Sequence, residues 1–330
     1  MKTKAAVLVR PGEIVLEDST LELAEDEVLV RTHRASICGT DKNLFRGLLP
    51  PWMSYPVEVF GHEGSGTVEA VGSKARGFRI GDEVMSFGET GCFAPYFKAK
   101  DSCLYKTPPG LPRDLAHLGE PAACAIYSVF QSGIQLEDVV AVVGLGFAGQ
   151  IMVQGAKKKG AGTVIGIDLL DGKTAIAREL GADITLNPKQ DNVKEAIADL
   201  TQGRGVDVAF EAAGTGDSIN LATSILKDNG ILALYSWSME PVTINISRWH
   251  HHAIDIRTTC IMHRHPPHER DIWVHRVLKP VETGMIRLDP LVTHEFKLSQ
   301  IQEAFQEAVS NPMAVKIAIV PQHVVDSNRL

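Results

Sequence analysis

Residues 139–149 read Val139-Val140-Ala141-Val142-Val143-Gly144-Leu145-Gly146-Phe147-Ala148-Gly149, and this stretch decides the fold of one half of the chain. The five apolar residues indicate a parallel strand that is buried on both faces. The glycines after them fit the pattern G-x-G-x-x-G, and residues 150–156 are typical of a helix. A strand, a glycine loop and a helix in this order form the phosphate-binding turn of a dinucleotide site.

Each glycine of this loop has a separate physical role. Gly144 permits the tight turn, Gly146 lets the backbone approach a pyrophosphate, and Gly149 allows the helix to pack closely on the strand. Phe147 and Ala148 stand where the helix begins, so that its N–H groups and positive dipole face the phosphates. We therefore expect all five residues to belong to a cofactor site.

The next predicted strand, 163–168, ends in an acid. Asp168 follows the last glycine by 19 residues. A carboxylate at this place accepts hydrogen bonds from both ribose hydroxyls of NAD and repels the 2′-phosphate of NADP. Leu169 and Leu170 come next, so no arginine directly follows the acid. The sequence predicts NAD as the cofactor. The alternative is that the glycines are ordinary turn residues and Asp168 is a helix cap.

The order of elements after the glycine loop defines the fold class. Predicted strands at 206–211, 230–236 and 254–258 alternate with helical stretches. This alternation indicates an α/β architecture with a doubly wound parallel sheet.

The rest of the chain has a different pattern. Residues 1–105 are β-rich, with short alternating runs that are broken by turn signals. A helix is predicted over 114–133 with Asp114 as its cap. From about residue 264 the order reverts, with an amphipathic helix over 301–309 and a final strand over 314–320.

Composition narrows the range of functions. A chain of 330 residues is long enough for two domains, and a net charge of −7 with a pI near 6.0 argues against nucleic acid as a partner. The apolar run at the N-terminus is too short for a signal peptide, and no stretch is long enough to span a membrane. We expect a cytoplasmic protein whose five cysteines are free thiols.

A second group of residues predicts chemistry. Cys38 and the pair His62-Glu63 supply a thiolate, an imidazole and a carboxylate, which are the ligands of a catalytic zinc with one position left open. Strand-like runs at 27–32 and 57–60 precede them and are expected to hold the ligands rigidly.

The stretch Gly61-His62-Glu63-x-x-Gly66-x5-Gly72 resembles the signature of the zinc-containing alcohol dehydrogenases, within the medium-chain dehydrogenase/reductase family. The resemblance covers nearly the whole chain, because several motifs occur in the family's order. It implies a GroES-like β-rich catalytic domain at 1–130 and 264–330. It also implies a Rossmann NAD-binding domain at 131–263.

The resemblance assigns the metal ligands residue by residue. Cys38 corresponds to the first zinc ligand and His62 to the second. Glu63 is a ligand in some relatives and a nearby alternative in others. Glu120 falls where alcohol dehydrogenases have a third ligand, and Pro121 follows it, as in the Glu-Pro pair of polyol dehydrogenases. It either binds the metal directly or acts through the metal-bound water. The sequence leaves open which glutamate binds directly, and without the resemblance Glu120 reads as a surface carboxylate.

Other roles also follow from the resemblance. Thr40 corresponds to the hydroxyl that bonds the substrate oxygen and takes its proton. Asp41 corresponds to the carboxylate that orients the zinc-bound histidine. By residue type alone, both are ordinary turn residues. Lys173 matches a lysine near the adenosine ribose. Asn43 departs from the family, because many relatives place a proton-passing histidine there and asparagine does not titrate.

The structural zinc of many relatives is expected to be absent. Such relatives bind it through four closely spaced cysteines, whereas this chain has only Cys92 and Cys103 between residues 84 and 105. We therefore expect one zinc ion per subunit.

Histidines concentrate at 250–252 and 262–270. By the family's order of elements, the second run lies near the nicotinamide, where polyol dehydrogenases have a substrate-contacting arginine. Arg264 is the nearest candidate, with His263 beside it. The alternative is a solvated loop, with some of the histidines at a subunit contact.

The sequence thus predicts a zinc- and NAD-dependent dehydrogenase that oxidises a secondary alcohol, polyol-like or anionic, to a ketone. Two alternatives remain: a zinc-free quinone or enone reductase of the same superfamily, and a non-catalytic NAD-binding protein. Apolar runs at 231–235 and 242–246 are expected to form a sheet edge through which a homodimer or homotetramer assembles. No nucleic acid or membrane partner is expected.

Overall fold

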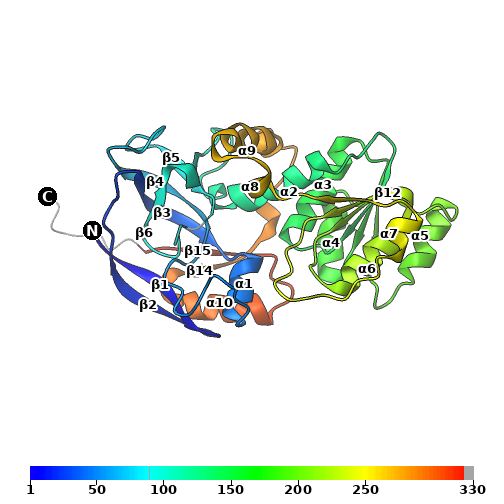
Figure 1. The fold of residues 1–330 in the computed structure, drawn as a ribbon, viewed down its shortest axis with the longest axis horizontal. Coiled ribbons are helices and arrows are strands. Elements are labelled where there is room, and N and C mark those ends of the chain that lie inside the picture. Colours follow the sequence, from blue (N-terminus) through cyan, green and yellow to red (C-terminus); the bar gives the residue numbers. More distant parts are fainter. Residues whose placement is uncertain (89, 323–330) are drawn as a thin grey trace. The chain divides into compact units, whose positions relative to one another are not determined.

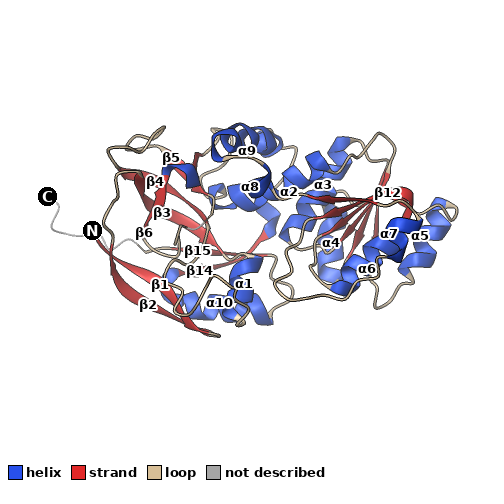
Figure 2. Ribbon diagram, in the orientation of Figure 1, coloured by secondary structure: helices blue, strands red, loops and turns tan. Residues whose placement is uncertain are grey.

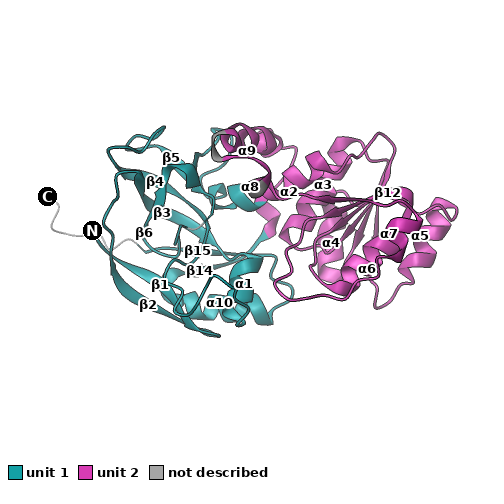
Figure 3. Cartoon of the chain, in the orientation of Figure 1, with its two compact units in different colours: residues 1–121, 292–330 teal, residues 122–291 magenta. Residues whose placement is uncertain are grey.

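The structure is a computed structural model that describes residues 1–88 and 90–322. The chain divides into two compact units, Met1–Pro121 with Val292–Leu330 and Ala122–Leu291 (Figure 3). The sequence placed these boundaries at 130/131 and 263/264, so the structure adds residues 122–130 and 264–291 to the second unit.

Contacts of one helix explain the difference in the first boundary. The Tyr127 ring packs edge-on against Trp273, with ring centroids 5.5 Å apart. Lys159 Nζ donates hydrogen bonds to the carbonyls of Val129 and Phe130, at 2.8 and 3.0 Å. The helix that carries residues 127–130 is therefore fastened to the second unit, although its first turn belongs to the first.

The first unit is β-rich, as the sequence predicts (Figures 1 and 2). Its strands are β1 (Lys2–Arg10), β2 (Glu13–Thr20), β3 (Glu27–Ser36), β4 (Glu63–Val71), β5 (Glu83–Ser86), β6 (Tyr96–Lys100), β7 (Leu104–Lys106), β14 (Val292–Lys297) and β15 (Lys316–Val320). Its helices and 3-10 turns are α1 (Gly39–Phe45), η1 (Asp101–Cys103), η2 (Ala116–Leu118), η4 (Leu298–Gln300) and α10 (Ile301–Ser310). Strands β1 and β2 form a separate pair. The larger sheet has the order β14-β15-β3-β4-β5-β7, with β6 also paired to β3.

Antiparallel pairing of β3 with β4 brings two distant segments together. Ser36, at the end of β3, lies opposite Glu63, at the start of β4. The strand predicted over 57–60 is wrong: Val57 makes a single bridge to Leu8, and Glu58 and Val59 are both exposed. Two consecutive exposed residues do not fit a half-buried strand, whose side chains alternate between faces.

The second unit is a doubly wound parallel sheet, which confirms the predicted fold class. Its strands are β8 (Val139–Val143), β9 (Thr163–Ile167), β10 (Ile184–Leu186), β11 (Val206–Glu211), β12 (Leu226–Leu234) and β13 (Asp255–Thr258). Its helices are α2 (Gly119–Gln131), α3 (Phe147–Lys159), α4 (Asp171–Glu179), α5 (Val193–Thr201), α6 (Gly216–Ser224), α7 (Ser247–His251), α8 (Ile261–Arg264) and α9 (Pro267–Glu282), with η3 (Asp289–Leu291) at the end. All neighbouring strands are parallel, in the order β10-β9-β8-β11-β12-β13. The order reverses between β8 and β11, and ligands bind at the carboxyl ends of the strands at such a point.

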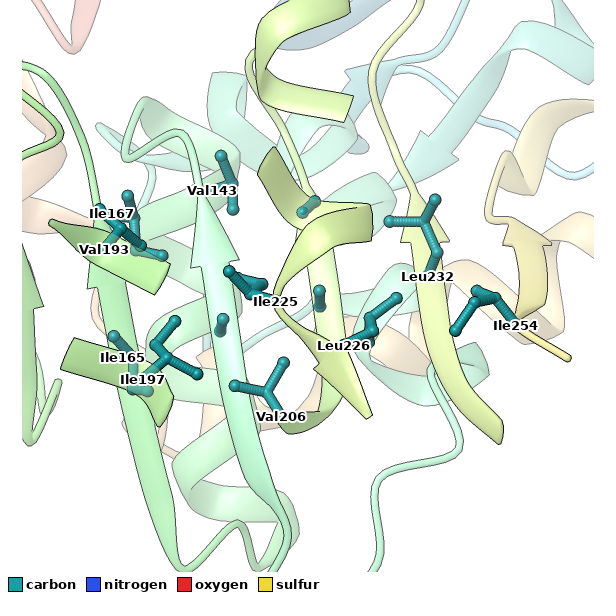
Figure 4. Close-up of a cluster of buried hydrophobic side chains, with 13 residues drawn as sticks. Val143, Ile165, Ile167, Val193, Ile197, Val206, Ile225, Leu226, Leu232 and Ile254 are labelled. Carbon is teal, nitrogen blue, oxygen red and sulfur yellow. The ribbon is translucent and has the colours of Figure 1, made fainter. Parts of the chain in front are cut away.

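The core of this unit lies between the sheet and the helices α5 and α6 (Figure 4). Alternate residues of β8 and of β9 point to it, because side chains of a strand alternate between the two faces. Its buried members are Ala141, Val143, Ile165, Ile167, Val193, Ile197, Val206, Ala209, Ala222, Ile225, Leu226, Leu232 and Ile254. Each large apolar side chain buried here contributes about 1.5–3 kcal/mol, which keeps the strand ends in place.

Two further expectations are corrected. Helix α2 begins at Gly119 and not near Asp114, because residues 115–118 form 3-10 turns, with Leu118 N–H bonded to the Leu115 carbonyl. Residues 242–246 lie outside any strand, and the outer strand on that side of the sheet is β13. In the part of the chain that the structure describes, no helix combines the length and apolar character needed to cross a membrane.

Candidate active site

Cys38 and His62 come together at one edge of the larger sheet in the first unit. Cys38 lies between β3 and α1, and His62 directly precedes β4. Because β3 and β4 are paired at Ser36 and Glu63, these two ends meet. One ligand atom from each of Cys38, His62 and Glu63 lies within 4.8 Å of the other two. Among the side chains that the structure describes, this is the one such group close enough to share a metal ion.

Close packing around His62 explains the glycines of the motif. Gly61 has a φ of +88°, and a Cβ atom there would lie 2.6 Å from the Phe93 ring. The Ser86 hydroxyl donates a hydrogen bond to the His62 carbonyl at 2.7 Å and accepts one from the Gly64 N–H at 2.9 Å. The backbone of His62 is therefore held on both sides.

Asp41 contacts both Cys38 and His62. Its buried carboxylate accepts a hydrogen bond from the Cys38 N–H at 2.8 Å, and its other oxygen lies 3.7 Å from Nδ1 of His62. A carboxylate in this position orients an imidazole so that the remaining ring nitrogen is free to bind a metal.

Burial and neighbouring charges shift the pKa values of Cys38 and His62. Burial and the charge of Glu63 raise the pKa of the Cys38 thiol. Burial alone would lower the pKa of His62, but Asp41, Cys38 and Glu120 together raise it well above its ordinary value. A metal ion bound by these groups would displace their protons. A sulfur, a nitrogen and carboxylate oxygens are the ligand set that suits zinc.

Glu63 is part of a buried ion pair that the sequence analysis did not foresee. Lys316 Nζ lies 2.9 and 2.7 Å from the two carboxylate oxygens, and the Ser36 hydroxyl donates a further hydrogen bond. Lys316 is 5% exposed and Glu63 is 0% exposed. The one signal in the sequence is a lysine in the middle of the apolar run 314–320.

The other predicted residues of this unit lie on neighbouring elements. Glu120, at the start of α2, is half-buried, and its charge helps to raise the pKa of His62 and of Lys316. Thr40 and Asn43 are half-buried in α1.

The glycine loop of the second unit lies between β8 and α3. Gly144 has a φ of +96°, and a Cβ atom on Gly149 would lie 1.9 Å from the Gly144 carbonyl oxygen. A Cβ atom on Gly146 would meet no atom within 4 Å, so its backbone faces open space at the start of α3. Phe147 is buried and Ala148 is half-buried in the first turn of that helix. This arrangement fits a phosphate group above the loop.

Asp168 lies directly beside this loop. One carboxylate oxygen accepts a hydrogen bond from the Leu145 N–H at 2.8 Å, and the other accepts one from the Leu170 N–H at 3.1 Å. Lys173 lies in the first turn of α4. The buried Gln150 amide donates hydrogen bonds to the carbonyls of Leu145, at 3.1 Å, and Lys173, at 2.9 Å. Gln150 therefore ties the glycine loop to α4, a role that sequence reasoning missed.

The residues predicted to contact substrate are on α8 of the second unit. The Arg264 side chain is exposed. The side chain of His263 lies outside the described residues. On the neighbouring segment, His265 Nε2 lies 2.9 Å from the Tyr127 hydroxyl, and the His265 ring stacks on Trp273 with centroids 4.8 Å apart.

Comparison with known proteins agrees with this geometry. Residues 24–113 match the family model of the alcohol dehydrogenase GroES-like domain, and residues 148–273 match that of the zinc-binding dehydrogenases. The chain is 26% identical to the L-threonine 3-dehydrogenase of Bacillus subtilis, over 94% of this chain and 95% of that protein. It is 27% identical to the sorbitol dehydrogenase of the same organism, over 96% of this chain and 97% of that protein.

A solved structure shares the fold. It is a zinc-binding dehydrogenase of Sinorhizobium meliloti bound to NADP, with a TM-score of 0.82, 27% identity, and coverage of 97% of this chain and 100% of that one. The chain belongs to the zinc-containing alcohol dehydrogenases of the medium-chain dehydrogenase/reductase family. It is an oxidoreductase that acts on alcohols, and its cofactors are zinc and a nicotinamide dinucleotide.

Proposed function

We propose that this enzyme oxidises a secondary alcohol to a ketone, with NAD as the hydride acceptor and one zinc ion per chain. The observation that carries the proposal is the convergence of Cys38, His62 and Glu63 within 4.8 Å, with Asp41 bonded to one ligand and next to another. Cys38 and His62 would hold the zinc ion with help from a carboxylate. When bound there, zinc would act as a Lewis acid that lowers the pKa of the substrate's hydroxyl group.

The chain's own residues position the substrate and move its proton. The Thr40 hydroxyl, in the first turn of α1, is the group we assign to bond the substrate hydroxyl and accept its proton. Asp41 keeps the His62 ring and the Cys38 backbone in fixed orientation. Asn43 does not titrate, so the proton leaves this site through water or another group.

The cofactor preference follows from Asp168. Its carboxylate lies at the end of β9 beside the glycine loop, where it would bond the ribose hydroxyls of NAD and repel a 2′-phosphate. The Sinorhizobium relative is bound to NADP, so the two coenzymes must be compared directly.

For the substrate we propose a polyol or an anionic hydroxy compound. The two Bacillus relatives are named for threonine, which has a carboxylate beside a secondary hydroxyl, and for the polyol sorbitol. Arg264 is exposed and carries a guanidinium that fits a carboxylate or a row of hydroxyl groups.

The deciding experiment combines metal analysis with a substrate panel. Purified enzyme is analysed for zinc and then supplied with polyols, hydroxy acids and hydroxysulfonates, each with NAD or NADP, while reduced cofactor is followed by absorbance. We expect about one zinc per chain and NADH formation with a secondary alcohol. A protein that binds no zinc and forms no reduced cofactor from any alcohol of the panel would instead favour the reductase alternative.

For the assembly we propose a homodimer or homotetramer that pairs through an edge of the second unit's sheet. β13 is the outer strand there and pairs with β12 alone among the described strands. An open edge of this kind offers N–H and carbonyl groups to a second chain. Light scattering coupled to gel filtration gives the mass, and a monomer at micromolar concentration would contradict the proposal.

A further inference from the structure

Glu211 is a buried carboxylate of the second unit that is not among the residues assigned to the metal or the cofactor. Glu211 is the last residue of β11 and is 0% exposed. Its Oε1 accepts hydrogen bonds from the N–H groups of Ala213 and Gly214, at 2.9 and 2.8 Å, and from the Ser218 hydroxyl at 2.7 Å. Its Oε2 accepts one from the Ser236 hydroxyl. Four donors thus surround one carboxylate inside the protein.

The bonded backbone belongs to a turn at the edge of the sheet. Residues 212–215 connect β11 to α6, and Ala213 and Thr215 are exposed although the acid that holds the turn is buried. β11 is the direct neighbour of β8, with Glu211 opposite Val143. The turn therefore lies beside the glycine loop, which begins at the next residue of the neighbouring strand.

The turn and the loop touch. A Cβ atom on Gly144 would lie 2.8 Å from the Ala213 nitrogen and 2.9 Å from the Ala212 carbonyl carbon. With so little space between the two backbones, a shift of the turn must be followed by a shift of the loop. On its other side the loop is held by Asp168 and Gln150, through Leu145.

We propose that Glu211 is a positioning residue of the dinucleotide site. Its carboxylate holds the 212–215 turn against Gly144 and thereby sets the position of the glycine loop and the affinity for the dinucleotide. The inference rests on the dinucleotide site of the second unit and is independent of zinc and of the choice between NAD and NADP.

The test uses three substitutions of one residue. Glu211→Met has a similar shape but no acceptor, so all four donors lose this partner inside the protein. Glu211→Asp keeps the charge on a shorter side chain that falls short of the turn. Glu211→Gln keeps one acceptor oxygen at full length and donates to Ser236 with its amide.

Asp207 offers a matched control on the same strand. It lies at the opposite end of β11, where its carboxylate accepts hydrogen bonds from the Val139 N–H at 2.7 Å and from Lys227 Nζ at 2.5 Å. Asp207→Leu removes a hydrogen-bonded carboxylate as Glu211→Met does, but at a partly buried position far from the carboxyl edge of the sheet.

Each full-length variant is titrated with NADH and NADPH by fluorescence, and its melting temperature is measured. Relative to wild type, we expect Glu211→Met and Glu211→Asp to bind the preferred cofactor at least tenfold more weakly. Glu211→Gln and Asp207→Leu should stay within threefold, even though Asp207→Leu melts at a lower temperature. If Glu211→Met does not fold, Glu211→Asp decides.

Two outcomes would overturn the proposal. One is wild-type affinity in Glu211→Asp. The other is an equal loss in Asp207→Leu, because the effect would then be general destabilisation. A wild-type protein that binds neither cofactor would instead refute the dinucleotide site itself, which distinguishes that failure from the failure of Glu211.

Discussion

At the residue scale, the metal site combines two kinds of carboxylate. Asp41 bonds to the backbone of one ligand and lies beside the ring of the other, whereas Glu63 has both oxygens bonded to Lys316 and one also to Ser36. A buried charge without its partner is costly, since water no longer solvates it. Removing one partner of the Lys316–Glu63 ion pair should therefore destabilise this edge.

Lys316→Met should destabilise the first unit by about 3–5 kcal/mol, because it leaves the Glu63 carboxylate buried and unpaired by charge. Denaturant unfolding measures the loss. Lys74→Met is the control, since Lys74 pairs with Glu25 on the surface and such exposed pairs contribute about 0–1 kcal/mol. Adding Glu63→Gln to Lys316→Met should recover part of the stability. If Lys316→Met and Lys74→Met were equally stable, this account of the ion pair would be refuted.

The two glutamates should differ in their effect on zinc. Because both oxygens of Glu63 are held by Lys316, we expect Glu120 to be the carboxylate that binds the metal. Glu120→Gln should then weaken zinc retention at least tenfold, while Glu63→Gln changes it less. Competition with a chelator measures both. The reverse order would make Glu63 the ligand.

Asp168 should affect more than cofactor choice. Asp168→Ser combined with Leu169→Arg is expected to shift kcat/KM towards NADPH, because repulsion of the 2′-phosphate is removed and a cation is added. The same change removes the acceptor of the Leu145 N–H, so affinity for both cofactors should fall. Asp168→Asn, which keeps an acceptor oxygen, is the control for this second effect. A wild-type enzyme that already prefers NADPH would refute the assigned role.

At the element scale, the short turn η2 introduces a pH dependence. Its central residue, His117, is fully buried, and burial together with the charges of Arg34 and Lys316 lowers its pKa from 6.5 to about 3. Below pH 6.5 the unfolded chain binds a proton here that the folded protein does not. Stability is therefore lost as the pH falls from 6.5 towards 3.

The size of this effect is testable. At pH 5 the histidine should cost the folded state about 2 kcal/mol relative to pH 8. In His117→Phe, stability measured by urea unfolding should fall less between pH 8 and pH 5 than in wild type. His251→Phe, on helix α7 of the other unit, should lose as much stability between pH 8 and pH 5 as wild type. If His117→Phe lost as much stability between pH 8 and pH 5 as wild type, other groups would be the cause of the acid sensitivity.

Sequence patterns predicted some elements well and others poorly. The all-apolar strand β8 and the strand β11 have the predicted bounds, because a strand buried on both faces is recognisable from composition alone. The start of α2 and the segment 57–60 were mispredicted, since tight turns and packing decide them locally. Cys38, His62 and Asp41 were predicted from their motifs, and the structure brings them close together. Lys316 and Glu211 were not, because their partners are set by tertiary contacts.

At the scale of the whole molecule, the residues that we assign to zinc and those that we assign to the dinucleotide lie in different units. The candidate metal ligands Cys38, His62, Glu63 and Glu120 all belong to the first unit, and the glycine loop and Asp168 belong to the second. Each unit has its own sheet. Damage to one site should thus leave the other intact.

Cys38→Ala tests this independence. We expect the variant to lose its zinc, since the thiolate is one of few ligands. Its kcat should fall at least 1000-fold. Its affinity for NADH, measured by fluorescence titration, should stay within about threefold of wild type. Cys103→Ala, in the turn η1, should keep both zinc and activity. A large loss of NADH binding in Cys38→Ala would show that the units are not independent.

The division of the first unit also sets an order of events during synthesis. Glu63 and Lys316 are 253 positions apart, and the chain leaves the first unit at Pro121 and returns to it at Val292. The entire dinucleotide unit is therefore synthesised before the lysine that neutralises Glu63 is added to the chain. A message cut short ahead of codon 316 would yield a protein whose nucleotide-binding half is complete and whose metal-binding half is not.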